Sequence, residues 1–179
     1  MSANKRDVLI FMLTAGLTLG LLLARVARVP EAVCADRMAA MLEAAGGSNR
    51  YLHGPPANAD FRAVVKPSPN LAYSACVYDV SEAPLAMEFP AHDDFWVNQV
   101  VADNTDSVAY TGLRDVGPRP SKFVLVSGDT PPTDIPGGFE VLHTPTPTGV
   151  MLLRYLVRSG EHLEEINRAR EQIELYTLE

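Results

Sequence analysis

The sequence predicts a mainly β protein: an antiparallel β-sandwich or barrel-like domain with a C-terminal helix, preceded by an N-terminal transmembrane helix. Three features of the 179 residues support this prediction. Short segments rich in β-branched and aromatic residues follow one another after residue 60, separated by turns that contain most of the 14 prolines. An uncharged apolar segment lies near the N-terminus, and an amphipathic segment closes the chain.

The N-terminal apolar segment is long enough to cross a bilayer. Residues 8–24 carry no charge. The segment reaches the about 20 residues of a membrane helix when it extends past Arg25 and Arg28, whose long side chains can reach the interface. A cleaved signal peptide also begins with basic residues such as Lys5 and Arg6, but arginines crowd every small residue where cleavage would occur. We therefore expect an uncleaved single-pass anchor whose partner is the lipid bilayer.

The distribution of charge indicates which side of the membrane carries the domain. The short tail before the apolar segment contains Lys5 and Arg6. The chain has a net charge of −7, and most acidic residues follow Pro30. Asp and Glu contribute little to the positive-inside rule, so an acidic domain crosses a membrane readily. We expect the N-terminus inside and the domain outside the cytoplasm. The same acidity argues against binding to nucleic acid.

Two glycines in the apolar segment form a GxxxG pattern. Gly16 and Gly20 are four residues apart, with Thr14 and Thr18 nearby. Small residues at this spacing let two helices pack closely in lipid. Glycine is also frequent in membrane helices that do not pair. The alternatives are a helix that packs against another copy, giving a homo-oligomer, and a helix that only anchors.

The chain divides into three segments: a tail and anchor at 1–30, a juxtamembrane helix at 31–48, and a β-rich domain with a C-terminal helix at 49–179. Gly46 and Gly47 end the second helix. An apolar stripe in the closing segment 159–178 predicts a helix there; it consists of Leu163, Ile166, Ala169 and Ile173. The predicted strands are 62–65, 72–80, 85–89, 95–103, 107–113, 122–128, 139–144 and 149–157.

The segment 72–80 reads as a central strand. Pro67 and Pro69 precede it and cannot donate hydrogen bonds to a sheet, so the strand begins near Leu71. Neither of its two faces is clearly polar. A strand with two apolar faces is buried on both, which favours a position inside the sheet over a position at its edge.

At this point the sequence resembles a known family. The stretches FRAVVKPSPNLAYSACVYDVSEAPLAMEFP, FWVNQVVADNTDSVAYTGLR, KFVLVSGD, IPGGFEVLHTPT and GVMLLRYLVRSGEHLEEINRAREQIEL are similar, in order and spacing, to the bacterial domain-of-unknown-function family 1254. The resemblance covers about residues 49–175 and implies a β-rich domain, frequently in secreted or envelope proteins. In this family the domain often sits beside a second domain, family 1214, on the same chain. One departure is Ser68-Pro69-Asn70, where the family has Asn-x-Asp.

Four residues are candidates for binding a ligand: Tyr73, Asp103, Arg114 and Arg154. Arg154 interrupts the apolar run GVMLLRYLV, and a buried arginine needs a paired carboxylate or a bound anion. Asp103 ends an apolar strand, and Tyr73 matches the family pattern. The alternatives are a structural ion pair and a polar pocket for a small anionic or carbonyl ligand.

The sequence shows no metal-ligand spacing and suggests no cofactor. His92-Asp93-Asp94 falls between two predicted strands, where Asp serves turns, and neighbouring residues of a strand point to opposite faces. No serine lies in a nucleophile elbow, and no Gly-rich loop precedes a helix. Cys34 and Cys76 are either a disulfide or two separate thiols.

These observations predict a protein of the bacterial inner membrane with a single span and its domain in the periplasm. The preferred function is an envelope module that assembles with a separate protein carrying a family 1214 domain. The alternative is an enzyme, or half of one, that binds a small anionic or carbonyl ligand in a polar pocket of the β domain.

Overall fold

A computed structural model of the protein describes residues 4–27, 29–58, 66–128 and 135–178. In chain order its elements are α1 (Lys5–Ala27), α2 (Val29–Ala45), β1 (Leu52–His53), β2 (Leu71–Asp79), β3 (Leu85–Phe89), β4 (Trp96–Ala102), β5 (Ser107–Gly112), α3 (Leu113–Val116), β6 (Ser121–Ser127), β7 (Glu140–Thr144), β8 (Thr148–Leu156), α4 (Gly160–Glu171) and β9 (Glu174–Thr177).

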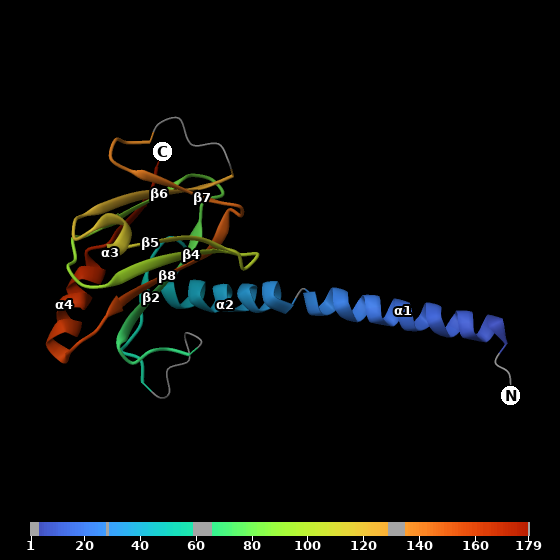
Figure 1. Cartoon of the computed structure of the whole chain (residues 1–179). Helices are drawn as coiled ribbons and strands as arrows, with labels where there is room; N and C mark the ends of the chain where they lie inside the picture. The colour runs from blue at the N-terminus through green and yellow to red at the C-terminus, as the bar shows by residue number, and fades with distance from the viewer. Residues whose placement is uncertain (1–3, 28, 59–65, 129–134, 179) are drawn as a thin grey trace.

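Two β-sheets pack around one hydrophobic core (Figure 1). The first has five strands in the order β1-β2-β8-β4-β5, and the second has four in the order β7-β6-β3-β9. The core takes Trp96 and Leu153 from the first sheet, Phe89 and Leu125 from the second, and Ile166 from α4. The predicted mainly β fold, with a C-terminal helix and an N-terminal apolar helix, is confirmed, and its two sheets form a sandwich.

Strand β8 shows why the five-stranded sheet has one buried and one half-exposed face. Its residues alternate strictly between half-buried and buried. Met151, Leu153 and Tyr155 point into the core and are at most 1 % exposed. Successive side chains of a strand point to opposite faces, so Leu152 and Arg154 lie on the other side. We call that side the outer face of the five-stranded sheet.

A glycine in β8 lets a tyrosine connect the two sheets. Gly149 is the register partner of Tyr78 in β2. The Tyr78 ring lies where a side chain of residue 149 would be, because a Cβ there would be 2.6 Å from the ring carbon Cζ. The Tyr78 hydroxyl then reaches Thr144 Oγ1 on β7 at 2.8 Å. A buried hydroxyl needs such a partner, and this one joins β2 to the second sheet.

Strand β2 has a neighbour on each side, β8 and the two-residue β1, as the apolar faces of the segment 72–80 predict. Two other features differ from the expectation. Strands β6 and β7 run parallel, so the second sheet is mixed. The predicted C-terminal helix ends at Glu171, and β9 follows it and pairs with β3. The free edge of β3 supplies the hydrogen-bond partners of β9, and the local sequence of residues 174–177 does not indicate them. The predicted strand at 62–65 lies outside the described residues.

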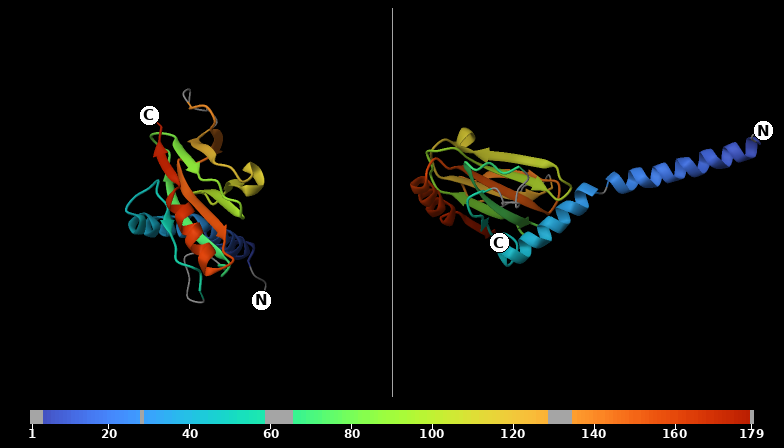
Figure 2. Two further views of the ribbon diagram at one scale, coloured as in Figure 1. Left: turned by 90° about the vertical axis from the view of Figure 1, so that its left-hand side faces the viewer. Right: turned by 90° about the horizontal axis from the view of Figure 1, so that it is seen from below.

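Two consecutive helices, α1 and α2, precede the sandwich. Helix α2 contacts β1 and β2, whereas α1 extends away from the domain (Figures 1 and 2). Helix α2 ends as the sequence predicts: Gly46 has φ of 71°, and the Gly47 N–H donates to the Leu42 carbonyl at 3.0 Å. The chain is then tied to β2, because the Asn49 N–H donates to the Val77 carbonyl at 2.8 Å.

Candidate functional site

The apolar N-terminal segment forms an exposed helix. Its stretch Val8–Val26 has 19 residues and a mean hydropathy of 2.0, and none of it is buried against the rest of the protein. Phe11 is 73 % exposed and Leu17 is 67 % exposed. This helix is long and apolar enough to span a membrane, and a signal sequence near an N-terminus has the same properties.

The polar side chains of this stretch bond within the helix. The Thr14 hydroxyl donates to the Ile10 carbonyl at 3.0 Å, and the Thr18 hydroxyl donates to the Thr14 carbonyl at 2.6 Å. Neither hydroxyl therefore needs water, which a bilayer core lacks. A Cβ at Gly16 or Gly20 would meet no heavy atom of the described chain within 4 Å, so that face is open to lipid or another helix.

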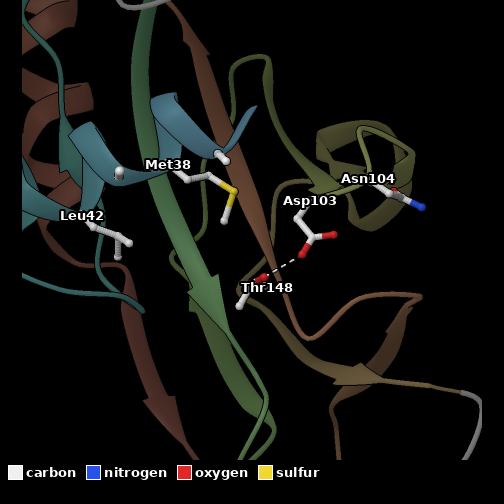
Figure 3. A pocket seen from close by; sticks show the side chains of 7 residues that line it. Met38, Leu42, Asp103, Asn104 and Thr148 are labelled. Atoms are coloured by element: carbon white, nitrogen blue, oxygen red, sulfur yellow. Dashed lines mark hydrogen bonds between the residues drawn. The ribbon is translucent and has the colours of Figure 1, made fainter. Parts of the chain in front are cut away.

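Helix α2 borders an open hollow of about 510 Å³ at one end of the five-stranded sheet (Figure 3). Met38 and Leu42 line it from α2, and Asp103, Asn104 and Thr148 line it from the sheet side. The Thr148 hydroxyl donates to Asp103 Oδ2 at 2.9 Å. The hollow therefore has one apolar wall and a carboxylate on the other, and the charge of Asp103 opposes the entry of an anion.

Tyr73 and Arg154 lie side by side on the outer face, because they are register partners in β2 and β8. Arg154 is half-buried, and its Nη2 donates to Gln99 Oε1 at 2.6 Å. No carboxylate among the described residues is within ion-pair distance of Arg154, so the predicted structural ion pair is not seen there. A guanidinium that is partly in water keeps most of its solvation, and a neutral amide oxygen is then a sufficient partner.

The other two predicted ligand residues lie elsewhere. Arg114 is exposed in α3, beyond the edge strand β5 and two strands away from β8. Asp103 follows β4 at the far end of the sheet, six residues beyond Val97, which is level with Arg154. Six residues of strand span about 20 Å. The structure thus brings Tyr73 and Arg154 together and leaves Arg114 and Asp103 apart from them.

Sequence reasoning missed a buried arginine in α4. Arg170 is 5 % exposed. Its Nη1 donates to the Tyr73 carbonyl at 3.1 Å and to the Gly54 carbonyl at 3.3 Å, and its Nη2 donates to Asn167 Oδ1. Its Nε is buried and has no hydrogen-bond partner among the described residues. The available signal was spacing: Arg170 is four residues after the buried Ile166, so it belongs to the apolar stripe of the helix.

A histidine and a serine adjoin this arginine. His53 Nδ1 is 2.8 Å from Ser74 Oγ, and Arg170 Nη1 is 3.5 Å from the same oxygen. Burial first, and then the positive charge of Arg170, lowers the pKa of His53. Ser74 is 1 % exposed in the middle of β2 rather than on a sharp turn, so it is not placed as a nucleophile. Two cavities, of about 400 and 260 Å³, share His53, Arg170 and Glu171 in their linings.

A pair of histidines meets at the start of α4. The rings of His92 and His162 stack with centroids 6.2 Å apart, although the two residues are far apart in the sequence. His162 Nε2 lies 3.2 Å from Asp94 Oδ2, and Arg158 Nη2 donates to Asp94 Oδ1. Within the described residues, no group of three or more His, Cys, Asp or Glu side chains is placed to hold a metal ion.

A comparison with family models identifies the sandwich. Residues 48–177 match the family described as "Protein of unknown function (DUF1254)". The chain belongs to the DUF1254 family. The match begins after α2, so membership in DUF1254 describes the sandwich with α4 and leaves the apolar helix α1 outside.

A solved structure shows the same architecture as this DUF1254 chain. It is similar to the crystal structure of the VPA0106 protein from Vibrio parahaemolyticus, with 14 % identity and a TM-score of 0.64, over 85 % of this chain and 37 % of that chain. A putative uncharacterized protein from Burkholderia cenocepacia aligns with 16 % identity and a TM-score of 0.41, over 58 % of this chain and 31 % of that one. The chain therefore spans little more than a third of the Vibrio protein. No curated protein matches the sequence.

The two cysteines of this DUF1254 chain are separate thiols. Cys34 lies on α2, where burial first, and then the negative charge of Asp103, raises its pKa. Cys76 is buried in β2, and burial raises its pKa to about 12. Both thiols therefore stay protonated at neutral pH, which makes them poor nucleophiles.

Proposed function

We propose that this protein is a single-pass inner-membrane protein that presents its DUF1254 sandwich in the periplasm and works by assembly with a partner. The observation that carries the proposal is the exposure of α1. An apolar stretch of 19 residues with none of its surface buried is not a core helix. A bilayer removes that apolar surface from water, and α2 then holds the sandwich close to the membrane through its contacts with β1 and β2.

The surface proposed for the partner is the outer face of the five-stranded sheet. Val97 and Leu152 are half-buried there, and Tyr110 is 56 % exposed on β5. Side chains of this face are already held in place, since Gln99 Nε2 donates to the Tyr110 hydroxyl at 2.9 Å and Gln99 Oε1 accepts from Arg154. Ordered aromatic and arginine side chains are typical centres of protein interfaces, because little side-chain entropy is lost on binding.

The proposed partner is a separate protein with a family 1214 domain. The Vibrio protein extends well beyond the region that aligns with this chain, so in that protein further segments of the same chain accompany the sandwich. We propose that a separate chain provides the corresponding contacts here. Two proteins anchored in one membrane meet more often than two free ones, which compensates in part for the missing covalent linker.

A reporter fused after Glu179 tests the topology. A fluorescent protein that matures only in the cytoplasm should remain dark in this fusion, and alkaline phosphatase at the same place should be active. Intact-mass analysis of the purified membrane protein should recover residues 1–30. Bright fluorescence would refute the periplasmic location, and a mass that lacks the N-terminal segment would show a cleaved signal peptide.

Affinity purification in mild detergent tests the partner. A family 1214 protein should copurify with the wild-type chain and be lost with Tyr110→Arg, which places a charge on the outer face. Tyr176→Arg is the matched control, because Tyr176 is 39 % exposed on β9 of the other sheet. Recovery of the chain alone, or of a dimer of this chain that survives Tyr110→Arg, would overturn the assignment of this surface.

A further inference from the structure

We infer that Arg170, His53 and Asn167 form a binding site for a small organic monocarboxylate in the hollow between α4 and the β1–β2 edge. This inference does not depend on the membrane anchor or on the partner. It starts from a buried arginine that forms no ion pair with any described residue. Arg170 is 5 % exposed, and in the described part of the chain no carboxylate pairs with it. Its donors meet only neutral oxygens, those of Gly54, Tyr73, Ser74 and Asn167.

An uncompensated buried cation is costly, and a bound anion removes the cost. Burial lowers the pKa of Arg170, which is the physical sign of this cost. A guanidinium still keeps its proton near neutral pH. Glu171 acts on Arg170 electrostatically but forms no ion pair with it, so a ligand can supply the direct counter-ion.

One edge of the guanidinium is placed for a carboxylate. Nη1 is committed to the backbone carbonyls of Tyr73 and Gly54. The remaining edge consists of Nε–H and Nη2. Within the described part of the chain Nε–H has no partner, and Nη2 meets only the Asn167 amide oxygen. These two donors are parallel, and their spacing matches the two oxygens of one carboxylate. A carboxylate that displaces the Asn167 amide would satisfy both.

The surroundings of this edge select the class of anion. Two cavities, of about 400 and 260 Å³, meet at Arg170 and His53. Pro55 and Pro56 give the larger cavity an apolar wall for a short carbon chain. Glu171 lines both cavities, and Arg50 lines the smaller one. Two guanidiniums and one carboxylate leave one positive charge, which suits a singly charged ligand and disfavours a phosphate dianion.

His53 adds a second, uncharged donor. Its Nδ1 lies 2.8 Å from Ser74 Oγ, and burial together with Arg170 lowers its pKa. The ring is therefore neutral at pH 7, and the Ser74 hydroxyl can donate to Nδ1. In that tautomer the proton is on Nε2, where it is available to the ligand.

The test measures binding of propionate to the full-length chain in deuterated detergent micelles. Ligand-observed saturation-transfer NMR at pH 7 suits a weak, small ligand. We expect a signal from propionate at constant ionic strength, and much weaker signals from propionamide, which lacks the charge, and from methylphosphonate, which carries more of it. Equal signals from propionate and propionamide, or a stronger signal from methylphosphonate, would overturn the inference.

Asn167→Asp supplies the critical variant. It places a carboxylate against Arg170 Nη2 from within the chain, so propionate affinity should fall about tenfold or more, in keeping with the loss of hydrogen bonds to a charged group. The unfolding temperature of the same variant should rise, because the buried charge gains a counter-ion. Asn167→Asp is a better test than Arg170→Gln, because a variant that loses the buried arginine and fails to fold reports nothing about binding.

Gln172→Glu is the matched control. It makes the same change of charge at an exposed position of the same helix end, and it should leave both propionate binding and the unfolding temperature as in the wild type. His53→Gln should weaken propionate binding by about threefold or more, through loss of one neutral donor. Unchanged binding in folded Asn167→Asp, or equal losses in Asn167→Asp and Gln172→Glu, would refute the site.

Discussion

Replacing Gly149 with alanine should destabilise the sandwich although alanine is the better strand residue. A Cβ at this position would overlap the Val101 carbonyl oxygen and the Tyr78 hydroxyl, and would lie 2.6 Å from Tyr78 Cζ. Carbon atoms in contact normally stay about 3.5 Å or more apart, so β4 or the Tyr78 ring must move by about 1 Å. Movement of the ring also breaks its hydrogen bond with Thr144.

The size of the effect follows from opposing contributions. Overpacking a well-packed core costs about 1–3 kcal/mol. The lost hydrogen bond between Tyr78 and Thr144 costs about 1 kcal/mol. Alanine regains about 0.5–1 kcal/mol, because glycine loses more backbone freedom on folding. The net loss in the free energy of unfolding is about 2 kcal/mol, which lowers the unfolding temperature by roughly 6 °C in a domain of this size.

Urea unfolding of the full chain in detergent, followed by tryptophan fluorescence, measures this loss. The chain has one tryptophan, Trp96, which is 1 % exposed in the core and therefore reports on the sandwich. Gly160→Ala is the matched control, because a Cβ at the start of α4 meets nothing within 4 Å of the described chain. It should be neutral or slightly stabilising. In a double-mutant cycle, Tyr78→Phe should make the loss from Gly149→Ala smaller. Equal urea midpoints for Gly149→Ala and the wild type would refute this account of the packing.

Three further predictions concern α4 and the outer face. Arg154→Leu removes one hydrogen bond to Gln99 at a half-exposed site and leaves no described carboxylate unpaired, so it should lower the free energy of unfolding by only about 1 kcal/mol. A loss of several kcal/mol in the same urea assay would reveal an ion pair. Ser159→Ala removes the cap that accepts from the His162 N–H at 3.2 Å, and it should cost about 1 kcal/mol, whereas Ser159→Asn should cost little. Burial, and then the positive charge of His162, lowers the pKa of His92 below 6.5. The unfolded chain therefore takes up a proton more readily, and the unfolding temperature should fall as pH drops from about 7.5 to 5.5. The unfolding temperature of His92→Gln should fall less over the same pH range. An equal fall for the variant and the wild type would exclude His92 as the cause.

Much of the fold could be predicted because its signals are local. The strand from 85 to 89 is predicted at both ends, since an apolar run between two turns needs no knowledge of its partner. The glycine stop of α2 is equally local, because only a residue that tolerates a positive φ ends a helix in this way. The apolar stretch that forms α1 is recognisable from composition alone.

The candidate sites were harder to predict, because they depend on which strands become neighbours. Arg154 was selected for interrupting an apolar run, but strand alternation places it on the half-exposed face, where an amide is a sufficient partner. The local sequence shows Arg170 only as a basic residue near a helix end, yet the docking of α4 buries it beside Ser74, almost a hundred residues earlier in the chain.

The sequence by itself determined the kind of most segments: an apolar helix, a helix with a glycine stop, and a series of short strands. The tertiary structure decided the pairing of those segments. Strand β9 forms because the edge of β3 is available for pairing, and β6 pairs antiparallel with β3 on one side and parallel with β7 on the other. A helix forms its hydrogen bonds within itself, so composition and period reveal it. A strand forms its hydrogen bonds with a distant segment, and so does a buried arginine. Which segment becomes the partner depends on the tertiary fold of the whole chain.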